Sequence, residues 1–445
     1  MLLMHWTRAS KSLLALCVGL YVFHLSQVWR NVVDLPVADE WEIFNPDQLP
    51  SGLTPGWLFA QHNEHRMATY KLSVWALYHA GGWDVAVHQV FNFLLYGAAV
   101  ALIFHLARRA APETPPWLVL GFNIFLLTTV GIQNHVMAIQ CAFHFWLIFF
   151  LLSARLLFDA AQGARALAVG SLCAALSVFS LASGVVSTVV LMLAFAAFKL
   201  SRAFGAGGGR ARRVELYQLL LVGVFVVGSV ALWLYGYRKP PQHPPLASPL
   251  GREFWDYFLN AVSFCFGFES LSKAAGLACL LVVLTPVCVL LWKRRGGLTA
   301  GQWTMFSAVA CMLAVLASIA AGRGEFGAAQ SKTSRYVEFG MALVPLSAVS
   351  WWALLKGREG LRAALLAALW LALFLAFLND WRFRDYRVER ALRLKGVECV
   401  RDYYLRGGEG LCPTIYPAPL GPRLDAARKL GAAFYRDLEL PAEGR

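Results

Sequence analysis

The sequence predicts an all-helical protein that crosses a membrane many times, and three observations lead to this prediction. Hydrophobic residues make up 58% of the 445 residues and charged residues only 15%, against about 25% charged residues in ordinary soluble domains. The mean hydropathy is +0.54. The apolar residues are gathered into runs of about 17–25 residues, the length at which a helix crosses about 30 Å of hydrocarbon. Backbone polar groups in hydrocarbon must be satisfied within the segment, so these runs are expected to be helices.

The apolar runs predict about eleven membrane spans. Arg8 and Lys11 precede the first run as in a signal peptide, but no small-residue cleavage site follows, so we expect a retained span. The segment 254–271 is also apolar, and we expect it to be interfacial or re-entrant, with Trp255 and Tyr257 at headgroup level. The predicted spans are 12–29, 86–106, 117–133, 141–158, 166–182, 185–200, 214–235, 272–292, 300–321, 337–355 and 362–379.

Basic residues predict the orientation of these spans. With the N-terminus in the cytoplasm, the clusters Arg108–Arg109, Arg210–Arg213 and Lys293–Arg295 all face the cytoplasm, as the positive-inside rule requires. Counting 254–271 as a further span would place Lys293–Arg295 outside. The formal net charge of +14 therefore indicates topology and not a nucleic-acid partner. We expect a multi-pass protein of the bacterial inner membrane, with its C-terminus outside and membrane lipids around it.

The chain divides into a membrane domain at 1–379 and a charged extracytoplasmic tail at 380–445. Aromatic residues in the tail suggest that it docks on the outer face of the membrane domain. Cys399 and Cys412 lie in this tail, which the topology places in an oxidising compartment, so we expect a disulfide between them. Two unrelated free thiols are the alternative.

The first external loop, 30–84, is strongly acidic within a basic protein. Asp39 and Glu40 follow the first span closely and are the candidate catalytic residues. Carboxylates held at a membrane surface under the aromatic cover of Trp41 and Trp57 can have a raised pKa and act as general bases. The alternative is a solvated acidic loop without a catalytic role.

A second polar cluster in the first loop is Gln61–Arg66. We expect it to begin a helix over 63–78, in which His62 and Arg66 share a face. Its side chains are of the types that bind sugar hydroxyls, and Arg66 is also suited to a phosphate. An ordinary capped helix is the alternative. The candidate substrate-binding residues in this cluster are His62, Glu64, His65 and Arg66.

Metal dependence is left open by the sequence. Asp39, Glu64 and a histidine are ligand types for a divalent ion such as Mg²⁺ or Mn²⁺, but their spacing matches no recognised ligand set, so we assign no metal ligand. The sequence also has no GxxxxGK[ST], HExxH or CxxC motif. Nucleotide hydrolysis and classical zinc chemistry therefore have no support.

A third cluster lies late in the membrane domain, in the external segment 322–336. Its glycines allow the backbone to approach a ligand closely. Arg323, Lys332 and Arg335 add positive charge on a side that is otherwise poor in it, and Tyr336 follows directly. We expect a polyanion as the partner. Arginines that reach toward lipid headgroups are the alternative.

This arrangement resembles the C-type glycosyltransferase superfamily of membrane enzymes, which use polyprenyl-phosphate-linked sugars. The resemblance rests on the acidic pair Asp39-Glu40, the Asn63–Arg66 cluster and the late external residues Gly322-Arg323 and Ser334-Arg335-Tyr336. It covers the topology of 1–379 and identifies no subfamily.

The resemblance implies an inverting transferase with few catalytic residues. Asp39 would be the base, with Glu40 as its neighbour or substitute, and Arg335 or Arg323 would meet the lipid phosphate. The donor would be a polyprenyl-phosphate sugar, and the acceptor a glycan, a lipid or a protein.

Two other classes of function remain as alternatives. A transporter or flippase of a lipid-linked or polar solute needs ionisable groups within the spans, and the nearest candidates are His24, His105 and His144. A non-catalytic subunit of an envelope-polymer assembly would use the tail to bind its partners.

Overall fold

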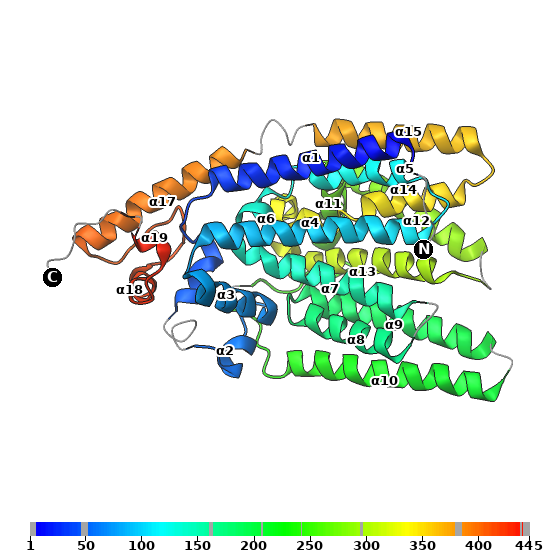
Figure 1. Ribbon diagram of the computed structural model, residues 1–445, viewed down its shortest axis with the longest axis horizontal. Helices are drawn as coiled ribbons and strands as arrows, with labels where there is room; N and C mark the ends of the chain where they lie inside the picture. Colours follow the sequence, from blue (N-terminus) through cyan, green and yellow to red (C-terminus); the bar gives the residue numbers. More distant parts are fainter. Residues whose placement is uncertain are drawn as a thin grey trace.

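The computed structural model describes residues 6–45, 52–159, 163–205, 208–241, 243–293, 297–378, 385–436 and 438. These residues fold into a bundle of long helices that lie side by side along the long axis of the molecule (Figure 1). The only strand-like pairing among them is a single bridge between His62 and His65. The all-helical prediction is therefore confirmed for the described part of the chain.

Nine helices within the described ranges are long and apolar enough to cross a membrane, which identifies an integral membrane protein. The outermost of them bury little of their surface: only 17% of the apolar window is buried in α1, α10 and α15. Such faces suit contact with lipid. The nine helices are α1 (Arg8–Asn31), α4 (Val85–Ala110), α7 (Cys141–Leu157), α9 (Ser183–Gly205), α10 (Gly209–Leu234), α12 (Lys273–Lys293), α13 (Ala300–Arg323), α14 (Leu343–Leu354) and α15 (Glu359–Phe377), with η4 (Ala138–Gln140) extending α7 and η7 (Ser334–Phe339) preceding α14.

The two remaining predicted spans are shorter helices. α8 (Ala164–Val178) has 15 residues, and α5 (Pro116–Asn123) is followed by a 3₁₀ turn, Ile124–Leu127. The predicted continuous run 117–133 is wrong, because the helix stops at Thr128, whose hydroxyl donates to the Phe125 carbonyl at 3.1 Å. A separate short helix, α6 (Ile132–Val136), follows.

The segment predicted to lie in the interface contains α11 (Arg252–Cys265). This helix packs against α12, α13 and the late external segment. Trp255 is 45% exposed, as expected of an interfacial anchor, but Tyr257 is completely buried. The placement of Tyr257 at headgroup level is therefore wrong, because its side of the helix faces the protein interior.

The first loop contains η1 (Ala38–Phe44), α2 (Pro55–Phe59) and α3 (Ala68–Gly81). Thr54 caps α2 by accepting a hydrogen bond from the Trp57 amide at 3.1 Å, and Pro55 occupies the first helical position.

The predicted helix over 63–78 begins too early. Before Ala68 the chain makes a tight turn instead, closed by two backbone hydrogen bonds of 2.8 Å between His62 and His65. Asn63 lies in this turn with a φ of +47°, a left-handed conformation that asparagine tolerates better than most residues. The turn separates the cluster from the helix, so His62 and Arg66 do not share a helical face.

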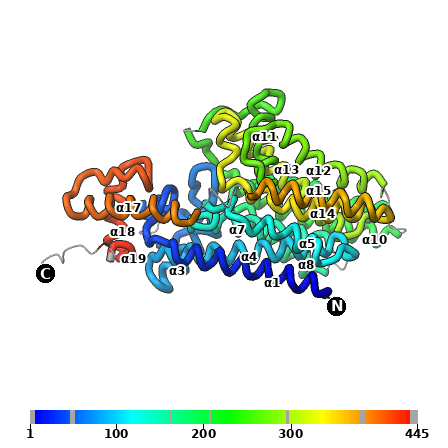
Figure 2. The backbone as a smooth tube through the Cα atoms, turned by 90° about the horizontal axis from the view of Figure 1, so that it is seen from above, coloured from blue at the N-terminus to red at the C-terminus, as the bar shows by residue number. Residues whose placement is uncertain are grey.

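The described part of the tail contains α17 (Tyr386–Arg406), α18 (Gly421–Lys429) and α19 (Ala433–Arg436). It lies at the same end of the bundle as the first loop in both views (Figures 1 and 2). The Ala38 amide donates to the Ile415 carbonyl at 2.6 Å, and the Ala433 amide donates to the Trp83 carbonyl at 2.8 Å. The tail thus docks on the membrane domain through the first loop.

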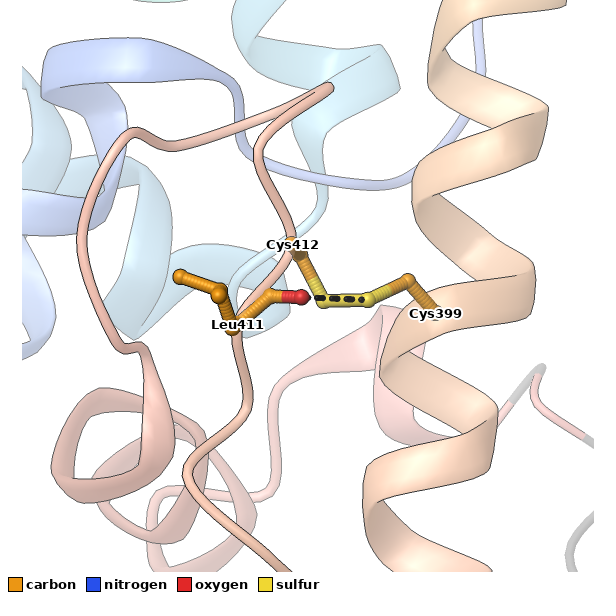
Figure 3. The surroundings of a disulfide bond; sticks show 3 residues. All are labelled: Cys399, Leu411 and Cys412. Atoms are coloured by element: carbon orange, nitrogen blue, oxygen red, sulfur yellow. Dashed lines mark hydrogen bonds between the residues drawn. A yellow bond between two sulfur atoms is a disulfide. The ribbon is translucent and has the colours of Figure 1, made fainter.

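A disulfide between Cys399 and Cys412 joins α17 to the segment that reaches Ile415 (Figure 3). We expect the Cys399→Ser/Cys412→Ser double variant to lose about 3 kcal/mol of tail stability, because the unfolded tail regains the entropy of the open loop. Limited proteolysis of the protein in nanodiscs should then cut the tail faster. The matched control is Cys288→Ser, which alters an exposed free cysteine in α12. Equal cleavage rates in all three proteins would contradict a stabilising role.

Candidate functional site

A cavity of about 740 Å³ opens where the first loop, the segment 237–246 and the late external segment meet. Segments distant in the sequence thereby come together around one cavity. The polar and charged side chains that line the cavity are Asp39, His62, Asn63, Glu64, His65, Gln140, Ser183, Tyr237, Lys239, His243, Ser318, Arg323, Arg335 and Tyr336.

The late segment around residues 322–336, predicted to be external, contains three short 3₁₀ helices, η5 (Gly324–Phe326), η6 (Ala328–Lys332) and η7. Lys332 fixes this segment to α11 and the turn after it. Its ammonium group donates to the Asn260 carbonyl at 2.9 Å, the Ser263 hydroxyl at 2.8 Å and the Phe268 carbonyl at 2.6 Å. Burial lowers the pKa of Lys332 to about 8. Its three donors are used inside the protein, so the expectation that Lys332 faces a polyanion is wrong.

Arg335 is one of the cations that line the cavity. Its guanidinium carbon lies 5.4 Å from the centre of the Tyr336 ring. Its Nε and the Tyr336 hydroxyl are buried and have no hydrogen-bond partner among the described residues. Within the same residues, no carboxylate lies within ion-pair distance of Arg335. Unpaired buried donors are costly, so a ligand with acceptor oxygens would be stabilised here.

A buried polar network holds η7 in place beneath Arg335. Glu338 contacts His144 Nε2 at 2.9 Å and His135 Nε2 at 3.5 Å. His144 Nδ1 in turn pairs with the Asn92 amide oxygen at 2.7 Å, and His135 Nδ1 pairs with the Tyr386 hydroxyl at 3.1 Å. Glu338 was not among the predicted site residues, although an acid within the predicted span 337–355 is itself a signal of a special site.

Glu64 is surrounded by positive or ionisable groups. It forms an ion pair with Arg323 across the cavity, and its carboxylate lies 3.6 Å from His65 Nε2 and 3.4 Å from His243 Nε2. Burial would raise the pKa of Glu64, but the charges of His65 and Arg323 outweigh it and bring this pKa to about 2. Glu64 is therefore ionised at neutral pH and balances the charge of Arg323.

His65 connects the first loop to the start of α9. Its Nδ1 accepts a hydrogen bond from the Ala182 amide at 3.2 Å, which leaves the proton of the neutral ring on Nε2, facing Glu64. Burial lowers the pKa of His65 to about 4. A neutral ring at pH 7 agrees with its acceptor role toward Ala182.

Arg66 does not line the cavity. Its guanidinium donates to three backbone carbonyls: Trp233 at 2.9 Å, Phe59 at 2.6 Å and Tyr235 at 2.6 Å. Two of these lie at the C-terminal end of α10, where carbonyl groups lack helical partners. The predicted contact of Arg66 with a substrate is therefore replaced by a structural role.

Asp39 projects into the cavity, and its side chain is 48% exposed. The preceding residue, Ala38, has a φ of +51°, a strained conformation for alanine that its hydrogen bond to Ile415 helps to hold. Asp39 Oδ2 lies 3.7 Å from His62 Nε2. The His62 imidazole holds the pKa of Asp39 below its usual range, and the charge of Arg335 adds to this.

The raised pKa expected for Asp39 is therefore wrong. Trp41 and Trp57, the expected aromatic cover, are buried and do not line the cavity. Burial alone would raise the pKa of Asp39, but the hydrogen bond from His62 and the charges around Asp39 outweigh burial and favour the carboxylate. Asp39 remains deprotonated at neutral pH.

Glu40 is completely buried and lies outside the cavity lining. Its carboxylate accepts from the Val37 amide at 2.9 Å and the Ile139 amide at 3.3 Å, and Arg393 Nη1 lies 3.8 Å away. Burial raises the pKa of Glu40. Glu40 therefore cannot replace Asp39 as a base that meets a ligand in the cavity, and it instead joins the first loop to α17 and the turn before α7.

No group of three or more His, Cys, Asp or Glu side chains in the described part of the chain is placed to hold a metal ion. Comparisons with family models, curated proteins and solved structures found no match to this chain. The function is therefore inferred from the cavity.

Proposed function

We propose that the protein is a membrane glycosyltransferase that moves a sugar from a polyprenyl-phosphate-linked donor to an acceptor hydroxyl. The main support for this proposal is that Asp39 of the first loop and Arg335 of the late segment line the same cavity. In this proposal the protein lies in the bacterial inner membrane, and the cavity opens on the outer side. The acceptor is a glycan, a lipid or a protein.

The lining of the cavity supports an amphiphilic donor. Its polar wall contains Arg335, whose planar guanidinium can donate two parallel hydrogen bonds to one phosphate. Its apolar wall includes Val186 from α9 and Ile319 from α13, two of the helices that are long and apolar enough to cross a membrane. A prenyl chain would lie along the apolar wall while the phosphate meets the arginine.

In the proposed reaction Asp39 acts as the general base and Arg335 stabilises the leaving group. Asp39 accepts the proton of the acceptor hydroxyl as its oxygen bonds to the anomeric carbon. The bond between that carbon and the phosphate oxygen breaks, its electron pair leaves with the phosphate, and the anomeric configuration is inverted. Arg335 stabilises the charge that develops on the leaving phosphate. A deprotonated Asp39 is ready for this role at neutral pH.

The proposal is tested with purified protein in nanodiscs supplied with polyprenyl-phosphate sugars and a mixture of hydroxyl acceptors. We expect release of polyprenyl phosphate together with a glycosylated product of inverted configuration. Nanodiscs without protein are the control. Failure of every donor both to bind and to turn over would reject the proposal.

A transporter is the second candidate, because Glu338, His135 and His144 form a buried ionisable group within the bundle. These side chains contact one another and lie outside the cavity lining, away from the space that a solute would occupy. Sealed vesicles that take up a polar solute or translocate a lipid-linked sugar without transferring the sugar would favour this candidate.

His62→Gln is expected to move the acid limb of the pH–rate profile to higher pH. Asp39 acts in its deprotonated form, so activity is lost as pH falls through the Asp39 pKa. His62 is the largest influence that lowers this pKa, and without it the limb should rise toward about pH 4, the ordinary value of a carboxyl group. The check is kcat/KM against pH for both proteins. An unchanged limb with full activity would show that His62 does not act on the base.

A further inference from the structure

We propose that Arg393, a buried arginine of the tail, is a positioning residue that sets where Asp39 lies relative to Arg335. This inference rests on the proposed transferase function and adds to it a contribution of the tail. Arg393 does not line the cavity. It therefore acts through the backbone segments that carry the two cavity residues.

The guanidinium of Arg393 binds two different segments of the membrane domain. Its side chain is only 4% exposed. Nη1 donates to the Leu35 carbonyl of the first loop at 2.7 Å, and Nη2 donates to the Val136 carbonyl at the end of α6 at 2.7 Å. A buried charge is costly unless it is paired, and the Glu40 carboxylate lies 3.8 Å from Nη1. The two carbonyls are thus held at a fixed spacing by one planar group.

The contacts of Arg393 in the first loop lie on both sides of Asp39. Leu35 precedes the turn that presents Asp39, and Glu40 follows Asp39 directly. The Glu40 carboxylate also accepts a hydrogen bond from the Val37 amide at 2.9 Å. Movement of the Arg393 guanidinium would therefore displace the backbone before and after Asp39.

The helix that carries Arg393 packs so closely on the first loop that it cannot move nearer. A Cβ atom added to Gly396, three residues after Arg393, would lie 2.3 Å from Ile415 Cγ2 and 3.0 Å from Leu35 Cδ2. Residues three apart lie on the same face of a helix. The backbone of α17 therefore cannot shift toward the loop to compensate for a change in the Arg393 side chain.

The contact of Arg393 with Val136 continues to Arg335 through α6. Asn134 belongs to this short helix, and its side-chain amide donates to the Arg335 carbonyl at 3.1 Å. The helix α6 also packs against η7, which contains Arg335. α6 therefore supports the backbone of Arg335, and Arg393 connects this support to the first loop.

A lysine at position 393 could not make the same connection. The guanidinium presents its donors in a rigid planar fork, whereas an ammonium group is a single point at the end of a flexible chain. Arg393→Lys keeps the positive charge beside Glu40 but loses the fixed spacing between Leu35 and Val136. The matched control is Arg390→Lys, the same change at an exposed arginine of α17 that does not line the cavity.

We expect Arg393→Lys to lower kcat for sugar transfer in nanodiscs by about 10², the effect of displacing a reacting group by about 1 Å. The KM for the donor should change less than kcat, because Arg335 and the apolar wall remain. In the Asp39→Asn background the same change should cause little further loss, since the group that it positions is already absent. A role in tail stability alone would lower the yield of folded protein and leave kcat per folded molecule unchanged.

Hydrogen exchange in nanodiscs tests the connection without any substrate. In Arg393→Lys we expect faster amide exchange both at 37–40 and at 334–336, whereas Arg390→Lys should exchange like wild type in both segments. Faster exchange in the first loop and the tail, with 334–336 unchanged, would show that Arg393 only docks the tail. That result would overturn the proposal.

The double variant Arg393→Met/Glu40→Gln keeps the proposal testable if Arg393→Lys does not fold. It removes both buried charges together, a replacement that proteins often tolerate, and it should show the same loss of kcat and the same exchange pattern. Wild-type kcat in either folded variant would overturn the positioning role. Absence of turnover by the wild-type protein with every donor rejects the transferase function instead, and the exchange pattern then still decides whether Arg393 connects the two segments.

Discussion

Asp39→Asn should lower kcat for sugar transfer by about 10²–10⁴, the typical contribution of a positioned general base. The amide keeps the size of the side chain and its place in the cavity but cannot accept the acceptor proton. In the proposed function the donor binds through Arg335 and the apolar wall, so the KM for the donor should stay close to the wild-type value. The measurement is steady-state transfer in nanodiscs, with thermal unfolding as a check on folding.

The matched control for this variant is Glu325→Gln, a carboxyl-to-amide change on an exposed acid outside the cavity, which should leave kcat unchanged. If Asp39→Asn folds and still turns over at the wild-type rate, another group must accept the proton. Glu40 is a poor candidate, because its carboxylate is buried and bound to the amides of Val37 and Ile139.

Arg335→Ala should lower kcat/KM by about 10²–10³, the loss typical of one preorganised donor aimed at developing charge. Both kcat and the KM for the donor should change. The guanidinium would bind the donor phosphate in the ground state, and it would stabilise that phosphate more strongly as the sugar leaves. Arg335→Lys should recover part of kcat/KM, since it restores the charge but not the two parallel donors. Kinetics over a range of donor concentrations separates the two effects.

Arg390→Ala provides the comparison for Arg335→Ala. Arg390 is an exposed arginine of α17 that does not line the cavity, so its loss should change neither kcat nor KM. Wild-type kcat/KM in a folded Arg335→Ala protein would require a different phosphate-binding group.

The helices were largely predictable because the length of an apolar run is a direct consequence of membrane thickness. The break at Thr128 was not, since a hydroxyl that bonds its own helix can occur without ending it. The tight turn at Asn63 was missed for a related reason. Its polar residues are compatible with a helix, and the local choice depends on contacts of His65 and Arg66 with α9 and α10.

The sequence predicted which types of residue line the cavity, but it did not predict which of the charged candidates face the cavity and which have a structural role. The resemblance implied roles for Asp39 and for Arg335 or Arg323 in one reaction, and these residues line the same cavity. Glu40, Arg66 and Lys332 looked equally suitable, yet their partners Ile139, Trp233 and Asn260 lie far away in the sequence. Spacing along a chain cannot show which charged side chain is satisfied by a distant backbone group.

The hydrogen bond between Ala38 and Ile415 has a consequence for biogenesis. The turn that presents Asp39 near the beginning of the chain is completed by a carbonyl from its last tenth, which lies three residues beyond a disulfide cysteine. The turn is therefore incomplete until the segment around Ile415 has been synthesised and has docked on the first loop. If the chain is the proposed transferase, its activity is expected to appear only once the segment around Ile415 has docked on the first loop.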